Sequence, residues 1–467
     1  MEAFIARSET ADTLDFEAFE AGLHGSIVLP GSPEYDAARH VHNANTDRRP
    51  ALIVRAADAS DVAQTVSLAR ESGLRLSIRG GGHSLAGYGT NDGGIVLDLG
   101  AMKGLHIDPD RRLAWAQPGL TAEEYTVAAA AHGLATPFGD TGSVGIGGLT
   151  LGGGIGWLVR KYGLAIDALV AVEIVTADGR QITASEDSHP DLFWAVRGGG
   201  GNFGVVTRFQ FKLYPVGQVL GGALFLPATR DTLRSLVPIA ANAPEELTTI
   251  SFLMQLPPAP FVPAELVGTS SLVVMLVWAG EPDAGQAAIQ PFRDVATPLV
   301  DMVMPMPYPG IYELLRSAEQ PSLAIHRSRF LSALDDDAVD EILEAMAAPT
   351  SPGAIIQLRV LGGAMARVDA TDTAFAHRDA AVLALIIANY DDAATEPVHR
   401  AWTDALHDAL APNSVGVYSN FLEAEGDERI RDAYPAGTYE RLADVKRRYD
   451  PSNLFRLNQN IRPAARS

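Results

Sequence analysis

The sequence predicts an α+β protein built from two unlike domains and a tail that returns to the first of them. Its 467 residues suffice for two or three domains. Glycine clusters gather in the first half, whereas long strands alternate with long helices after about residue 216. Short motifs rich in Asn and Tyr follow residue 415. We therefore expect a first domain over 1–215 with its core at about 46–215, a second domain over 216–414, and a C-terminal segment over 415–467.

The first half contains a strand, a helix and a second strand that runs directly into a glycine loop. Apolar residues of 74–78 alternate with polar ones up to Arg79, which is typical of a half-buried strand. Ser60 is the expected N-cap of the preceding helix, and Gly73 its end. The other elements expected before residue 120 are a helix and an extended piece within 15–29, a polar loop over 35–47, a strand over 50–54, and strands over 95–99 and 113–116 that continue the same sheet.

Capping and turn signals mark the later elements. Thr121 and Glu124 form a T-x-x-E capping box for a helix that ends near Gly133. Asp178 and Gly179 predict a hairpin turn after a strand. Further strands are expected over 169–176, 205–213, 272–278, 355–361 and 382–389, and further helices over 282–295, 335–346 and 395–410.

Composition excludes several classes of function. The chain has 36 basic and 57 acidic residues, a net charge of −21, which repels nucleic-acid phosphates and anionic lipid. We therefore expect no nucleic-acid partner and no membrane partner. The absence of cysteine rules out disulfides, thiolate metal ligands and a thioether link to a cofactor. Residues 1–20 lack a basic stretch followed by an apolar run, so we expect no signal peptide and a cytoplasmic protein.

Three glycine clusters are the strongest local signal. They read RGGGHS over 79–84, GDTGSVGIGGLTLGGGIG over 139–156, and GGGGNFG over 198–204. Glycine loses more chain entropy on folding than any other residue, so such a set indicates that something needs bare backbone. Exposed backbone amides form concave anion sites, which favours a large anionic cofactor. For any single cluster, a structural turn remains the alternative.

Other site chemistries fit the sequence poorly. The first glycine loop does not open a helix, as a Rossmann fingerprint requires, and no G-K-[ST] follows any glycine run. Asp140, Thr141 and Gly142 match one half of an aspartic protease site, but the required second copy is missing. No histidine pair has zinc-ligand spacing, so we expect no metal site.

His83 lies inside the first glycine loop. A lone histidine is more often structural than reactive, and that alternative stays open here. A neutral imidazole is nonetheless a competent nucleophile toward an electrophilic carbon. The 8α-methyl group of an isoalloxazine becomes such a carbon when the flavin tautomerises. The loop therefore raises the hypothesis of a covalently held flavin.

Taken together, these motifs resemble those of berberine bridge enzyme-like flavoproteins within the vanillyl-alcohol oxidase class, bacterial members in particular. The resemblance spans nearly the whole chain. It implies a two-lobed FAD-binding domain of the PCMH type and a substrate domain whose antiparallel sheet covers the isoalloxazine. The motifs that carry it are those of 79–84 and 139–156, HPDLFWAVRGGGGNFGVVT over 189–207, YSN over 418–420 and YDPSNLFRLNQNI over 449–461.

The resemblance also implies how FAD is held. His83 matches the histidine that is linked to the flavin 8α carbon. Thr141 occupies the position at which some relatives carry a second linking cysteine, so attachment through His83 alone is expected. The cofactor-binding residues expected from the motifs are Arg79, Gly80, Gly81, Gly82, His83, Ser84, Gly87, Gly119, Gly139, Thr141, Gly142, Ser143, Gly145, Gly147, Gly148, Gly152, Gly153, Gly154, Gly156, Val205, Val206, Tyr418, Asn420, Asn458 and Asn460.

A smaller set is expected to act on substrate or oxygen. Val144 matches a gatekeeper position, where valine favours an oxidase over a dehydrogenase. Tyr418 matches a tail tyrosine that acts near the flavin, with a buried core tyrosine as the alternative. Gln357 and Arg359 share one face of the strand over 355–361 and point either to the ring or to solvent. Asn389, at the end of the next strand, is a weaker candidate.

The implied reaction is the transfer of a hydride from a C–H next to OH or NH onto flavin N5, with O2 then reduced to H2O2. The expected partners are a small-molecule substrate and O2, and the expected state is a monomer or homodimer. A dehydrogenase with another electron acceptor, an oxidative cyclase, and a flavin-binding protein without catalysis are the alternatives. The sequence does not name the substrate.

Overall fold

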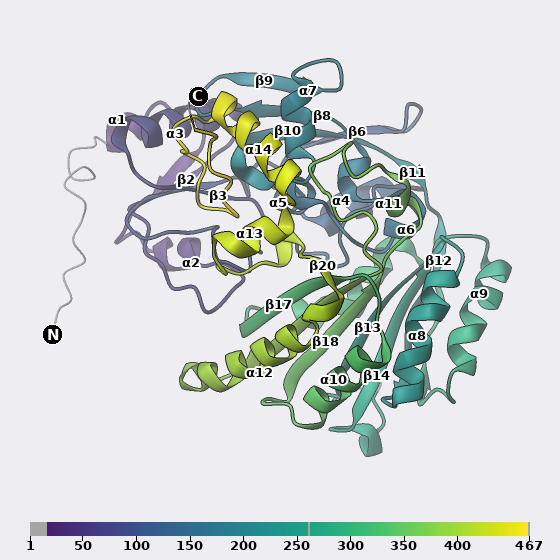
Figure 1. Cartoon of the computed structure of the whole chain (residues 1–467). Helices are drawn as coiled ribbons and strands as arrows, with labels where there is room; N and C mark the ends of the chain where they lie inside the picture. Colours follow the sequence, from purple (N-terminus) through teal and green to yellow (C-terminus); the bar gives the residue numbers. More distant parts are fainter. Residues whose placement is uncertain (1–15, 260–261, 466–467) are drawn as a thin grey trace.

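The computed structural model describes residues 16–259 and 262–465, and it confirms the predicted α+β fold (Figure 1). An upper lobe contains the N-terminal half together with the end of the chain, and a lower lobe carries one large sheet. Residues 1–15, which include most of the stretch assessed for a signal peptide and the first position of the predicted helix, lie outside the described residues.

The first small sheet of the upper lobe has the order β1-β2-β4-β3. Helix α3 (Ala59–Ser72) packs on it and ends at Gly73, whose φ of 69° confirms the predicted stop. Its N-cap is Asp58, whose carboxylate accepts the amides of Ser60 and Asp61, so the assignment to Ser60 was wrong. The strands are β1 (Ser26–Val28), β2 (Leu52–Arg55), β3 (Leu76–Arg79) and β4 (Ile95–Asp98).

A second sheet, with the order β5-β6-β10-β8-β9, completes the upper lobe. The predicted strand over 113–116 belongs to this sheet, because it pairs with 209–212, and so does not continue the first sheet. The predicted hairpin turn is confirmed, with Gly179 at φ 82° between β8 and β9. The strands are β5 (Leu105–Asp108), β6 (Leu113–Ala116), β8 (Leu169–Val175), β9 (Gln181–Ser185) and β10 (Val205–Lys212), with the separate pair β7 (Leu134–Ala135) and β11 (Tyr214–Pro215).

The lower lobe is a nine-stranded antiparallel sheet. Helices α8, α9, α10 and α12 lie on the side away from the upper lobe, where leucine and isoleucine side chains pack between helices and sheet (Figure 1). The opposite face is turned toward the glycine loops. The strands are β12 (Gln218–Pro227), β13 (Leu247–Gln255), β14 (Ser270–Trp278), β15 (Val300–Asp301), β16 (Met304–Pro307), β17 (Leu323–Leu331), β18 (Gly353–Val360), β19 (Val382–Tyr390) and β20 (Ser414–Gly416).

The structure contains helices that the sequence analysis did not name, two of them in stretches expected to be a loop and a glycine cluster. Residues Tyr35–Arg39 form a short helix inside the predicted polar loop, and Ile146–Gly152 form a helix inside the second glycine cluster. The Thr121–Glu124 capping box is confirmed in both directions.

The helices are α1 (Phe16–Glu20), α2 (Tyr35–Arg39), α3, α4 (Ala122–Ala130), α5 (Ile146–Gly152), α6 (Val159–Tyr162), α7 (Pro190–Val196), α8 (Arg230–Asn242), α9 (Pro282–Asp294), α10 (Asp336–Ala347), α11 (Ala364–Arg367), α12 (Glu396–Ala409), α13 (Asp427–Ala433) and α14 (Ala436–Tyr449). Within the described chain, none of these helices combines the length and the apolar composition needed to cross a membrane.

The end of the chain crosses from the lower lobe back to the upper one. After β20 joins the large sheet, α13 and α14 run back across the upper lobe (Figure 1, yellow). Lys446 on α14 is fully buried, lies 2.8 Å from the Asp450 carboxylate, and donates to the carbonyls of Asn202 and Phe455. This one ammonium therefore ties the last segment to the third glycine cluster.

We predict that Lys446→Met lowers the free energy of unfolding by about 3–5 kcal/mol, because it leaves the buried Asp450 carboxylate without its counter-charge. Urea titration followed by tryptophan fluorescence measures the loss. Lys103→Met is the matched control: Lys103 pairs with Glu124 at the surface, so its loss should cost at most about 1 kcal/mol. Equal stability of the two variants would contradict the anchoring role of Lys446.

Candidate active site

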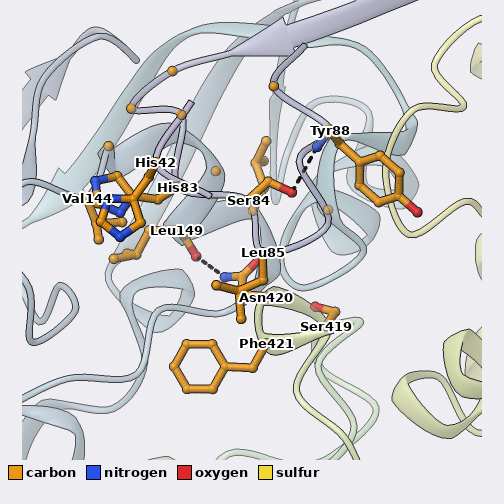
Figure 2. Close-up of a pocket in the computed structure, with 18 of the residues that line it drawn as sticks. His42, His83, Ser84, Leu85, Tyr88, Val144, Leu149, Ser419, Asn420 and Phe421 are labelled. Carbon is orange, nitrogen blue, oxygen red and sulfur yellow. Dashed lines mark hydrogen bonds between the residues drawn. The ribbon is translucent and has the colours of Figure 1, made fainter. Parts of the chain in front are cut away.

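A cavity of about 690 Å³ lies where the glycine loops, the large sheet and the C-terminal segment meet. The upper lobe contributes residues of the first and second glycine clusters together with β10. The lower lobe contributes β18 and β19, and the tail contributes Tyr418 to Leu422, Phe455 and Leu457 to Gln459. Figure 2 shows side chains of the first two glycine regions and of the tail around this cavity. The volume is in the range typical of cofactor and substrate sites.

The first two glycine clusters touch each other through bare backbone. A Cβ atom added to Gly81 would collide with the backbone nitrogen of Gly145, and one added to Gly145 would collide with Gly81. By contrast, a Cβ on Gly148 or Gly201, which also line the cavity, would meet nothing within 4 Å. The first pair therefore needs glycine for close approach, while the second pair leaves open backbone facing the cavity.

His83 lines the cavity and is stacked on His42, with ring centroids 4.2 Å apart and planes inclined by 22° (Figure 2). Burial and the neighbouring His42 lower the pKa of His83 to about 4. Burial also lowers the pKa of His42. Both rings are consequently neutral at physiological pH, and His83 keeps a nitrogen lone pair available.

Arg79, at the end of β3, is fixed before the first glycine loop begins. Its guanidinium is buried, lies 2.8 Å from the Asp98 carboxylate at the end of the neighbouring strand β4, and donates to the carbonyl of His40. Within the loop, Ser84 Oγ accepts the backbone amide of Tyr88 (Figure 2). The loop that carries His83 is therefore held by charge at its start and by a turn after the histidine.

The Tyr418 hydroxyl is buried against the second glycine cluster. It accepts the backbone amide of Gly154 and the Nδ2 group of Asn420, each at 2.9 Å. Asn420 also donates to the carbonyl of Leu149 (Figure 2). Burial raises the pKa of Tyr418, while these donors and the nearby Arg359 guanidinium act in the opposite direction.

Gln357 and Arg359 both line the cavity from β18, as two residues of one strand face must. Arg359 Nη2 lies 2.5 Å from the Asp140 carboxylate, which belongs to the second glycine cluster. This ion pair joins the lower lobe to the upper one inside the cavity wall. Asn389 also lines the cavity, but its oxygen accepts Ser322 Oγ and its amide donates to Gly353, so both of its polar atoms are occupied.

The predicted site residues fall into two groups. Those that line the cavity are Arg79, Gly80, Gly81, Gly82, His83, Ser84, Gly139, Thr141, Val144, Gly145, Gly147, Gly148, Val205, Val206, Gln357, Arg359, Asn389, Tyr418, Asn420 and Asn458. The remaining predicted residues do not line the cavity. Gly156 allows close approach to the Phe138 carbonyl and Gly119 to the Leu99 carbonyl, and the others are Gly87, Gly142, Ser143, Gly152, Gly153, Gly154 and Asn460.

Sequence reasoning missed three chemically active side chains. His42 comes from a stretch predicted as a plain loop, and Asp140 was noted only as a fragment of a protease motif. His326, on β17, lines the cavity and is bonded through its ring and its amide to the buried carboxylate of Glu423. Only Asp140 had a usable signal, because it lies inside a glycine cluster.

One side-chain group with metal-ligand chemistry lies elsewhere. Ligand atoms of His24, Asp58 and Asp61 fall within 4.8 Å of one another near the start of α3. The Asp61 carboxylate already accepts the amides of His24, Gly25 and Ala57, and Asp58 caps the helix. Local hydrogen bonding therefore accounts for this group without an ion.

The residues of the cavity fit a large polar cofactor. Buried polar atoms of lining residues lack partners within the described chain: Gln357 Oε1, Asn458 Oδ1, and Nε and Nη1 of Arg359. Buried polar groups are normally hydrogen-bonded, so these atoms, one in the tail and three on β18, indicate polar ligands at both places. Open backbone at Gly148 and Gly201 adds amides suited to an anionic group.

Comparison with known proteins identifies the cofactor. Residues 50–185 match the model of an FAD binding domain, and residues 417–462 match the berberine and berberine-like model. An FAD-linked oxidoreductase of Bacillus subtilis, YgaK, is 32% identical to this chain. The alignment spans 95% of this chain and 98% of YgaK. The chain belongs to the berberine bridge enzyme-like family of FAD-linked oxidoreductases.

Two further relatives agree with this assignment. (R)-6-hydroxynicotine oxidase of Paenarthrobacter nicotinovorans is 33% identical, with 94% of this chain and 97% of that protein aligned. The crystal structure of 6-hydroxy-D-nicotine oxidase from Arthrobacter nicotinovorans superposes with a TM-score of 0.85 at 31% identity, covering 95% and 98% of the two chains. The protein is thus an FAD-dependent oxidoreductase, and its first two glycine clusters lie within the segment that matches the FAD binding domain model.

The two family models leave the large sheet uncovered. Residues 186–416 match neither model, and they include β18 and β19 with Gln357, Arg359 and Asn389. The first two glycine clusters and the tail therefore match the models. The third glycine cluster, β10 and the large sheet, which also line the cavity, do not.

Proposed function

We propose that the protein is an oxidase that removes two electrons from a small organic molecule and reduces O2 to H2O2. The observation that carries the proposal is the convergence of a neutral histidine, a hydrogen-bonded tyrosine and a half-paired arginine in one buried cavity of an FAD-linked oxidoreductase. The name of the 33% identical relative, an oxidase, supports O2 as the acceptor. Bound FAD would supply the two-electron acceptor for the hydride of the substrate and the electron donor for O2.

Tyr418 is our candidate for moving the substrate proton. Oxidation at a C–H beside OH or NH requires the proton on that heteroatom to leave. The Tyr418 oxygen accepts two donors from the protein, so its own O–H is left to face a cavity ligand. The same donors stabilise the phenolate that would take up the proton, while burial keeps the phenol neutral in the resting protein.

His83 is our candidate for a covalent bond to FAD. Its ring is neutral because burial and His42 lower its pKa to about 4, and a neutral imidazole is the nucleophilic form. The surrounding glycines leave room on the cavity side, and the stacked His42 fixes the ring plane. Thr141 lines the same cavity but carries no thiol, so the proposal is a single attachment.

The test of the oxidase proposal is a peroxide screen across alcohols, sugars, cyclic amines and phenolic compounds. We expect one H2O2 per molecule of substrate oxidised, and rapid recovery of the oxidised flavin spectrum in air. Val144 lines the cavity, so Val144→Ile narrows it by one methylene and should slow reoxidation by O2 without slowing flavin reduction. Slow reoxidation of the wild type in air, together with fast reoxidation by a quinone, would instead show a dehydrogenase.

We predict that acid-precipitated wild-type protein keeps its yellow colour, whereas His83→Ala releases flavin into the supernatant. His132→Ala, at an exposed position, is the matched control and should retain the colour.

The pKa of His83 in the folded chain lies below its usual 6.5, so the nucleophilic form persists at neutral pH. Attachment of FAD to the cofactor-free chain should therefore fail only as the pH falls through about 4. Free flavin from the wild type would contradict the covalent link.

Replacement of Tyr418 by Phe should reduce kcat/KM by about 10²- to 10⁴-fold, the usual contribution of a positioned proton acceptor. Burial raises the pKa of Tyr418, so the wild-type rate should climb with pH on the alkaline side, and this rise should disappear in the variant. Tyr162→Phe, which removes a hydroxyl bonded to the Pro215 carbonyl outside the cavity, should keep the wild-type profile. An unchanged alkaline limb in Tyr418→Phe would assign the proton transfer elsewhere.

A further inference from the structure

The substrate side of the cavity carries a charge pattern that selects a class of substrate. We propose that the substrate presents an electron-rich oxygen, of a carbonyl, phenolate or carboxylate group on an apolar body, to Arg359, and that protonated amines are poor ligands. The inference rests on the proposed function, because it names the substrate class of the same site.

Two of the guanidinium nitrogens of Arg359 are hydrogen-bond donors without an acceptor among the described residues. Its side chain is about 5% exposed, and its Nη2 group is bound to Asp140. Its Nε and Nη1 groups have no partner among the described residues, although both are buried. A buried donor without a partner is costly, so a ligand that supplies an oxygen is stabilised there. A guanidinium has donors only, and therefore offers nothing to an ammonium group.

The position of Arg359 is fixed before any ligand arrives. The Asp140 carboxylate holds one terminal nitrogen at 2.5 Å, and the Phe421 ring lies 4.7 Å from the guanidinium carbon. Because one edge is occupied by the ion pair, the free N–H groups point in set directions. This arrangement recognises a single oxygen atom better than it recognises a diffuse negative charge.

A cationic ligand finds no counter-charge. Asp140 is the one carboxylate among the described residues that line the cavity, and it is already paired with Arg359. The other lining arginine, Arg79, is paired with Asp98. A protonated amine would lose its hydration on entry and gain no free anion in return, which disfavours its binding.

The sheet around Gln357 sets the rest of the ligand. Phe252 on β13 and Leu385 on β19 lie opposite Gln357 in the strand register, and Ile355 and Ile387 line the cavity beside them. Gln357 Oε1 is a buried acceptor without a partner among the described residues. The face therefore suits an apolar ring or chain with an acceptor oxygen toward Arg359 and a hydroxyl or N–H toward Gln357.

The test is equilibrium binding of three matched probes to the holoenzyme, followed by the change in flavin absorbance. Benzoate carries an anionic oxygen, benzamide a neutral carbonyl, and benzylamine a cation on the same ring. We expect benzoate and benzamide each to bind about tenfold or more tightly than benzylamine. Benzylamine binding as tightly as benzoate would overturn the inference.

Two variants separate the role of Arg359 from a loss of folding. Arg359→Met leaves Asp140 unpaired and should raise the affinity for benzylamine relative to benzoate. The double variant Arg359→Met/Asp140→Asn removes both charges and should weaken benzoate about tenfold or more while leaving benzylamine unchanged. A cooperative thermal unfolding transition, followed by circular dichroism, shows that each variant is folded. Arg230→Met, which removes an exposed arginine paired with Asp340, is the matched control and should bind all three probes as the wild type does. Unchanged benzoate binding in the double variant would overturn the inference.

The probes are not turned over in this measurement, so the inference and the oxidase proposal can fail separately. A holoenzyme that ranks the probes as expected but reacts slowly with O2 would retain the substrate class and lose the oxidase assignment. Peroxide formation with protonated amines alone would retain the oxidase assignment and overturn the proposed substrate class.

Discussion

The backbone contact between Gly81 and Gly145 is the constraint on which the rest of the site depends. Each glycine lies where a Cβ would collide with the other loop, so the two clusters can meet only because both positions lack a side chain. Their contact brings His83 from one cluster and Val144 from the other to one cavity (Figure 2), which Thr141 also lines. Glycine is entropically costly in a folded chain, and here that cost is offset by the space and free amides that result.

The Asp140–Arg359 ion pair links that cluster to the large sheet. Its partners are far apart in the sequence and come from different lobes, so the pair fixes the distance between the two lobes at the cavity wall. The same contact also neutralises the one lining carboxylate within the described chain. A single interaction thus contributes to the arrangement of the lobes and to the kind of ligand that the cavity accepts.

Local signals made much of the fold predictable. The Thr121–Glu124 box, the Gly73 stop and the Asp178–Gly179 turn act over a few residues, and the structure confirms each. The sheet membership of residues 113–116 was not predictable in the same way, because it depends on pairing with a strand almost a hundred residues later. The N-cap was misplaced for a local reason: Asp58 and Ser60 are both good caps, and only the backbone geometry distinguishes them.

The same distinction between local signals and long-range contacts applies to the candidate site. The glycine clusters, His83 and Tyr418 can be identified from composition or motif, and all of them contribute to the cavity lining. His42 and His326 do not, because each acquires a role only through a neighbour distant in the sequence: His83 for the first and Glu423 for the second. Asn389 shows the opposite error. Its position at a strand end looked suitable for catalysis, but the fold uses both of its polar atoms internally.

Burial gives the cavity a consistent electrostatic character. Exclusion of water disfavours charge, so it lowers the pKa of His83 and raises that of Tyr418, and both side chains are neutral at physiological pH. A neutral imidazole and a neutral phenol place no fixed charge near the ligand, and the two arginines are paired with carboxylates. What remains is a set of unsatisfied donors and acceptors, of which the Arg359 N–H groups are the strongest. Specificity in such a site is decided by hydrogen bonding to a desolvated oxygen, since a ligand that lacks this acceptor leaves the buried donors unpaired.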